Sequence, residues 1–130
     1  MPRKVFTAGD VLTAADVNLY LSNEAVFASS TALTYTVLPA DRYETLVFTA
    51  GSAVTVTIGT ATAFEPGERI DILQDGAGTV TIQRDGTATS LFGRGTAGTA
   101  YRIGQRYDAV SVVCVATNSY RIIGNANAVV

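Results

Sequence analysis

The residues of this chain that could perform acid–base chemistry are carboxylates, because the sequence contains no histidine. Its absence removes the commonest general base, the Ser-His and Cys-His pairings, and the commonest metal ligand. The closest acidic neighbours are Glu65 with Glu68, and Asp71 with Asp75. We expect Asp71 in a strand and Asp75 in the next turn, where Asp75-Gly76 has the sequence of a tight hairpin. We therefore predict a protein that is not an enzyme and requires no metal and no cofactor.

A second candidate for chemistry is the segment GRGTAG at residues 93–98, which matches the Gly-x-Gly-x-x-Gly spacing of dinucleotide-binding proteins. That motif binds pyrophosphate only where a strand leads through the glycines into the N-terminus of a helix. Here the glycines lead into a strand-like segment, residues 99–103, so we expect a Gly-rich loop between strands. Arg94 in this loop and Asn118 in the segment ATNS are the candidate residues for contact with a partner.

The single cysteine and the tyrosines have structural interpretations that we favour over functional ones. Cys114 lies in the apolar run AVSVVCVA, where a small buried hydrophobe is expected rather than a reactive thiol. Aromatic faces can also stack on sugar rings, but the chain has no tryptophan, and we expect its tyrosines mostly to close the ends of a β domain. The tyrosines considered are Tyr35, Tyr43, Tyr101, Tyr107 and Tyr120.

Composition limits the classes of partner. The chain has 130 residues, which fits one domain with a modest core, and it is 48% hydrophobic but only 15% charged. A net charge of −2 gives no electrostatic basis for binding nucleic acid. The start predicts no signal peptide, and no apolar run approaches the roughly 20 residues of a membrane span. So few charges favour a protein that is buried in an assembly.

The elements that position these residues begin with a predicted helix. Thr13 is a suitable N-cap residue, and Asp16, three residues later, completes a variant capping box. We therefore expect a helix of about 14 residues that begins at Ala14. Its apolar positions are spread over more than one side, and such a helix is marginal alone in water. It therefore needs neighbours, either other subunits or one end of its own β domain.

From Ala32 onward the hydrophobic period falls to two, which predicts strands separated by Gly, Asp and Asn turn signals. This pattern predicts a mainly β fold, an antiparallel β-sandwich or barrel-like domain at residues 31–130, preceded by a helical arm at residues 1–30. The expected strands are 33–38, 43–50, 53–58, 69–73, 78–82, 99–103, 109–116 and 119–124.

The alternation also predicts which strand faces are dry. Val54, Val56 and Ile58 alternate with threonines, as in an ordinary half-buried strand. Other strands are apolar on both sides, so both sides require cover, from a neighbouring subunit or from the predicted helix. On these strands one face is already apolar. The apolar residues on the opposite face are Val47, Leu73, Val113, Val115 and Ile123.

Two stretches of the sequence resemble segments of known proteins. FTAGDVLTAADVNLYLSNEAV, residues 6–26, resembles the N-terminal segment of tail-associated structural proteins of phages that infect actinobacteria. AVTVTI, FEPGERIDILQDGAGTVTI and YDAVSVVCVATNSYRIIGN resemble a small β domain found in phage tail fibres and head fibres. The resemblance implies a non-enzymatic structural component of the virion, assembled in the host bacterial cytoplasm and often trimeric.

Together, resemblance and composition predict a homo-oligomer, with a trimer favoured, that contacts other virion proteins and neither binds nucleic acid nor inserts into membranes. The tail tip, tail fibre or baseplate region is the leading location. A capsid decoration protein or head fibre is the alternative, and a module that binds host surface glycan is a second alternative. The residues predicted to dock the arm onto the virion or between protomers are Phe6, Val11, Leu12, Val17, Tyr20 and Leu21.

Overall fold

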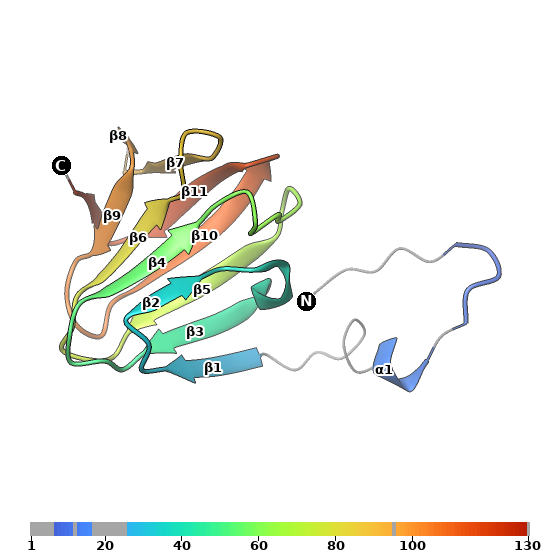
Figure 1. Cartoon of the computed structure of the whole chain (residues 1–130), viewed down its shortest axis with the longest axis horizontal. Helices are drawn as coiled ribbons and strands as arrows, with labels where there is room; N and C mark the ends of the chain where they lie inside the picture. The colour runs from blue at the N-terminus through green and yellow to red at the C-terminus, as the bar shows by residue number, and fades with distance from the viewer. Residues whose placement is uncertain (1–6, 12, 17–25, 95, 130) are drawn as a thin grey trace.

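Two mixed β-sheets make up most of the described chain (Figure 1). This computed structural model describes residues 7–11, 13–16, 26–94 and 96–129. The seven-stranded sheet has the order β1-β3-β5-β10-β11-β7-β8, and the five-stranded sheet has the order β12-β9-β6-β4-β2. The strands are β1 (Val26–Ser30), β2 (Thr34–Thr36), β3 (Glu44–Phe48), β4 (Val54–Ile58), β5 (Arg69–Gln74), β6 (Val80–Arg84), β7 (Ser90–Gly93), β8 (Thr96–Gly98), β9 (Ala100–Ile103), β10 (Ala109–Ala116), β11 (Ser119–Gly124) and β12 (Ala126–Ala128).

The first six strands wind as a coil, because successive strands alternate between the two sheets. Strands β1, β3 and β5 are parallel neighbours in one sheet, and β2, β4 and β6 are parallel neighbours in the other. Each connection crosses to the opposite sheet. The chain therefore completes one full circuit between strands of the same sheet, and each new strand runs parallel to the strand of the previous circuit. The expectation of an antiparallel domain is therefore wrong for this half of the fold.

The second half of the chain supplies the antiparallel pairs. Strand β10 pairs with β11 as a hairpin and also with β5, while β9 pairs with both β6 and β12. A further hairpin joins β7 to β8, and β7 lies parallel to β11. The segment GRGTAG thus leads from strand to strand, as expected, and not into a helix, but its residues 96–98, which we expected in the loop, form β8.

Close contact between two turns fixes the spacing of the coil. The turn after β5 stacks on the turn after β3, where Gly76 N–H donates to the Phe48 carbonyl and Gly78 N–H donates to the Ala50 carbonyl, each at 3.0 Å. A Cβ atom on Gly78 would overlap the Ser52 carbonyl. Glycine is required here because backbone approaches backbone.

This stacking corrects the tight hairpin expected at Asp75-Gly76. The sequence does mark a turn, but β5 and β6 lie in different sheets and do not pair with each other. The Asp75 N–H donates to the Phe48 carbonyl of the preceding circuit at 2.9 Å. The Asp-Gly pair therefore carries the chain between sheets, and its hydrogen bonds go to the neighbouring turn.

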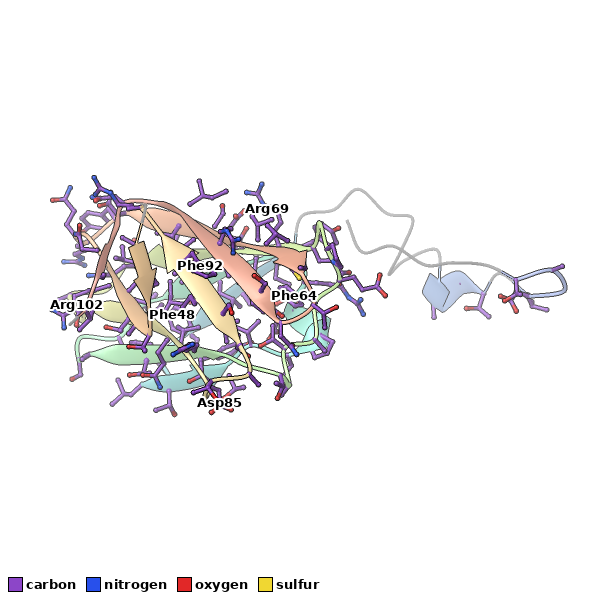
Figure 2. All side chains as sticks on the ribbon, turned by 90° about the horizontal axis from the view of Figure 1, so that it is seen from above. Phe48, Phe64, Arg69, Asp85, Phe92 and Arg102 are labelled. Carbon is purple, nitrogen blue, oxygen red and sulfur yellow. The ribbon has the colours of Figure 1, made fainter. Side chains whose placement is uncertain are left out.

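One core lies between the sheets, and it receives alternate residues of both. Val54, Val56 and Ile58 are buried as predicted, with half-buried threonines between them. In Figure 2, Phe48 lies between Arg69 on one side of the molecule and Asp85 on the other. Tyr101 and Tyr120 are fully buried in this core, so they belong to its packing.

The predicted N-terminal helix is largely absent from the described residues. Helix α1 (Ala14–Asp16) has three residues, and residues 17–25 lie outside the described chain. From Val26 the chain forms β1, so a helix that continues through Ala28 is wrong. Ala28 lies beside Leu46 and packs against the core, whereas Phe27 lies beside Thr45 and is exposed. Pairing along β3 outweighs a weak helix propensity here.

The stacked turns yield a prediction about stability. Replacing Gly78 with Ala forces a methyl group into the Ser52 carbonyl and should lower the free energy of unfolding by about 2–3 kcal/mol. Gly51→Ala is the matched control, because a Cβ at Gly51 meets nothing within 4 Å. Urea denaturation of both variants measures the difference, and equal stability of the two would contradict the turn contact.

Candidate interaction surface

The outer faces of the two sheets, meaning the sides turned away from the shared core, differ in chemistry. The outer face of the five-stranded sheet is polar. One cross-strand row on it has partners in register from β2 to β12. The residues of this row are Thr34, Thr55, Thr81, Arg102 and Asn127. Threonine is common on the solvent side of strands, and this face exposes little apolar area.

The outer face of the seven-stranded sheet is apolar over much of its area, as the two-sided strands predicted. Phe27 is 67% exposed, Ile123 is 60% exposed and Val115 is 45% exposed, while Leu73 and Val113 are half-buried. Val47 lies in register with Leu73 and is only 5% exposed. No helix of the described residues lies on this face, and Figure 1 shows α1 apart from both sheets.

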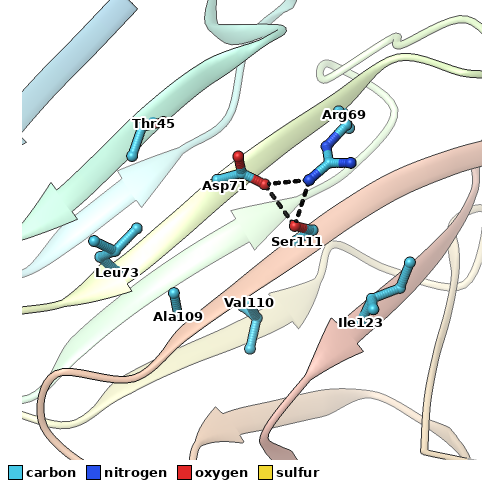
Figure 3. A pocket seen from close by; sticks show the side chains of 8 residues that line it. All are labelled: Thr45, Arg69, Asp71, Leu73, Ala109, Val110, Ser111 and Ile123. Carbon is cyan, nitrogen blue, oxygen red and sulfur yellow. Dashed lines mark hydrogen bonds and ion pairs between the residues drawn. The ribbon is translucent and has the colours of Figure 1, made fainter. Parts of the chain in front are cut away.

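A cluster of three polar side chains lies in the middle of this apolar face (Figure 3). Arg69 Nη2 donates to Asp71 Oδ1 and to Ser111 Oγ, each at 2.9 Å. The Ser111 hydroxyl donates to the same Asp71 oxygen at 2.5 Å. The cluster borders a shallow depression of about 230 Å³ whose walls include Leu73 and Ile123.

The sheet register brings this cluster together. Asp71 on β5 lies directly beside Ser111 on β10, and Arg69 precedes Asp71 by two residues on the same side of the strand. All three groups satisfy one another, and the arrangement orients them.

A second charged group on this face is also satisfied within the chain. Arg121 lies over the ring of Phe92, with the guanidinium carbon 4.5 Å from the ring centroid. Its Nη1 donates to Ser119 Oγ and to the Tyr120 carbonyl, each at 3.2 Å. A stacked guanidinium with such partners can lose water at modest cost.

Most residues predicted for docking of the arm lie outside the described chain. Val11 is described, and it is 78% exposed. An exposed valine fits a contact residue, but its exposure alone does not identify a partner. The predicted docking residues outside the described chain are Phe6, Leu12, Val17, Tyr20 and Leu21.

The two predicted loop contacts, Arg94 and Asn118, do not form one surface. Asn118 precedes β11, and its carbonyl accepts from the Ser90 N–H at the start of β7. Arg94 follows the other end of β7, and its Nη1 donates to Asn125 Oδ1 at 3.4 Å. Both residues have a left-handed backbone conformation, with a φ of 43° at Arg94 and 54° at Asn118. Tight turns explain this conformation at both positions.

The remaining candidates for chemistry have structural surroundings. Glu68 is buried and forms an ion pair with Arg42 at 3.1 Å, while its other carboxylate oxygen accepts from the Glu65 N–H. The thiol of Cys114 is buried, and burial raises its pKa, so it stays protonated at neutral pH. No three His, Cys, Asp or Glu residues of the described ranges gather as a metal site.

Sequence reasoning missed the Arg69, Asp71 and Ser111 cluster. A signal was present, since Arg69 and Asp71 alternate with isoleucines and Ser111 interrupts an apolar strand. What the sequence lacked was the pairing of β5 with β10, which sets these residues side by side.

No model of a known protein family matches the chain. A search of curated proteins likewise finds no match. Among the described residues, the structure contains no helix of sufficient length and apolar character to cross a bilayer.

Proposed function

We propose that this protein is a non-enzymatic structural subunit of a tailed-phage virion, built as a β-sandwich of two mixed sheets. The tail tip or tail fibre region is the proposed location, and a capsid decoration or head-fibre protein is the alternative. The resemblance of its N-terminal segment and β domain to phage virion proteins supports this assignment. In this proposal the chain forms homo-oligomers, with a trimer favoured by the resemblance, and contacts other virion proteins.

The observation that carries the proposal is the apolar face of the seven-stranded sheet, which the described residues leave uncovered. Phe27, Val115 and Ile123 expose large apolar side chains on one side of one sheet. An apolar face of this kind on a chain with few charges marks a contact with another subunit. Glu68, Asp71 and the thiol have structural partners or surroundings, so an assembly role accounts for more of the molecule than catalysis does.

The N-terminal segment is proposed as the second attachment point. Its predicted contacts are Phe6, Val11, Leu12, Val17, Tyr20 and Leu21, and Val11 is exposed. The segment precedes β1, the edge strand of the seven-stranded sheet. An arm at this edge can reach a neighbouring subunit that lies against the same sheet.

A glycan- or receptor-binding module is a weaker proposal. Of the tyrosines considered, Tyr101 and Tyr120 are buried in the core. Tyr107 is 71% exposed, and the guanidinium carbon of Arg106 lies 4.8 Å from its ring centroid, so it is the aromatic face that could stack on a sugar. Saturable binding of host envelope glycan that Tyr107→Ala abolishes would favour this role.

The assembly proposal predicts that a charge on the apolar face disrupts self-association. Ile123→Glu puts a carboxylate, which must lose its water, into the contact and should weaken association at least about 100-fold. Thr36→Glu, on the polar outer face of the five-stranded sheet, is the matched control and should associate like the wild type. Light scattering across a concentration series reports the mass. A wild-type chain that stays monomeric throughout would refute the proposal.

Location in the particle is tested by composition. Quantitative mass spectrometry of purified virions should detect the chain at a fixed copy number, because a structural subunit occupies symmetry-related positions. A few copies per particle indicate the tail tip, whereas hundreds indicate the capsid. Absence of the chain from purified particles would contradict a virion role of either kind.

A further inference from the structure

We propose that the outer face of the seven-stranded sheet binds the same face of a second copy of this chain, so that two molecules pack sheet against sheet about a two-fold axis. The inference rests on the proposed function, in which this face is buried in an assembly. It identifies the partner as one further copy of the chain, and it replaces the trimer that the resemblance favours with a two-fold pair. The charges on the face, the contrast with the opposite face, and the area all support it.

Each charged group on this face already has partners within the chain. Arg69 is bonded to Asp71 and Ser111, and Arg121 is stacked on Phe92. By strand alternation, Arg69, Asp71 and Arg121 are the charged side chains that the described strands place on this face. Arg69 and Asp71 neutralise each other, whereas Arg121 keeps its charge and is stabilised by the Phe92 ring, Ser119 Oγ and the Tyr120 carbonyl, so burying it costs less than burying an ion without partners. Such a face, mostly apolar with one ion pair and one ring-stacked cation, fits a largely apolar partner.

A second copy offers one broad apolar face of this kind, and it is the same face. The outer face of the five-stranded sheet carries the row from Thr34 to Asn127 with Arg102 within it. An apolar surface pressed on that row would strip water from hydroxyl groups without replacing their hydrogen bonds. Self-association therefore pairs like with like, and a contact between identical faces closes as a pair.

The area is sufficient for a specific pair. Seven strands about 4.8 Å apart span roughly 30 Å, and five residues of strand span about 17 Å, so the face covers about 500 Å² in plan. Two such faces remove about 1,000 Å² in plan, and the accessible area of the side chains exceeds the plan area. This reaches the range of specific protein interfaces. Two twisted sheets can also pack face to face in the aligned manner, about 10 Å apart.

The shape of the face also suits a contact between two copies. The depression beside Arg69 and Asp71 lies on β5 and β10, the third and fourth strands of the sheet order. Ile123 stands beside it and is 60% exposed. In a two-fold pair centred on these strands, Ile123 of each copy can enter the depression of the other.

Sedimentation equilibrium and spin-label distances on the full chain test this pairing. The label is placed at Ala109→Cys on the apolar face, with Arg102→Cys on the opposite face as the control; both positions are exposed, and the native Cys114 is buried. The pair predicts a mass of two chains. With sheets stacked about 10 Å apart, it predicts a label separation below about 25 Å at position 109 and above about 30 Å at position 102.

The outcomes separate this inference from the proposed function. A mass of three chains, or a short separation at position 102 instead of position 109, overturns the two-fold pair. If either result is found and Ile123→Glu still dissociates the assembly, the apolar face is still buried in a contact. Its partner is then a different surface from the one proposed here. A monomer at every concentration overturns both. Unchanged thermal unfolding of the labelled variants shows that the fold is intact.

Discussion

The seven-stranded sheet is apolar on both sides, and the described part of the chain covers only one of them, with its own second sheet. The inner side receives Leu46, Ile72 and Val112, which are almost completely buried beneath the five-stranded sheet. The outer side carries Phe27 and Ile123, which the described chain leaves in contact with water. Burial of apolar area contributes about 25 cal/mol per Å², so each of these side chains favours a partner. This imbalance between the two sides links the fold to its proposed role.

The coil made by the first six strands explains how so small a domain comes to have such a sheet. Each circuit adds one strand to each sheet, and the stacked turns hold the circuits in register through Gly76 and Gly78. The antiparallel strands β10 and β11 then widen only the seven-stranded sheet. Its added strands bring their own apolar outer residues, whereas the five-stranded sheet keeps a threonine-rich outer face. The outer residues of these strands, together with Phe27 on β1, make that face apolar, and the described residues leave it exposed.

Local patterns in the sequence predicted most of the strands, and long β-branched runs predicted them best. The bounds of β10 and β11 agree with the expected 109–116 and 119–124. Alternation also identified the two-sided apolar strands. The helix prediction failed at β1 because Val26 and Phe27 fit either period, and only pairing with β3 decides between them. The short strands β7, β8 and β12 lack enough residues to show a period.

Parallel pairing and the polar cluster were beyond local reasoning for a common reason. A turn signal such as Asp75-Gly76 shows that the chain reverses, but not whether it returns in the same sheet or crosses to the other. Asp71 and Ser111 are 40 residues apart, and their contact depends on the register of β5 against β10. The sequence therefore identified an apolar surface that needs a partner, and the structure showed which residues form that surface.

Side-chain footprinting of the full chain at low and high concentration tests most directly whether the outer face of the seven-stranded sheet is buried by assembly. A carbene reagent labels exposed side chains, and mass spectrometry locates the label. The account predicts that labelling of Phe27, Val115 and Ile123 falls as concentration rises, while labelling of Tyr107, which lies in the turn before β10, stays constant. Labelling of Phe27, Val115 and Ile123 that does not change with concentration would contradict burial of this face.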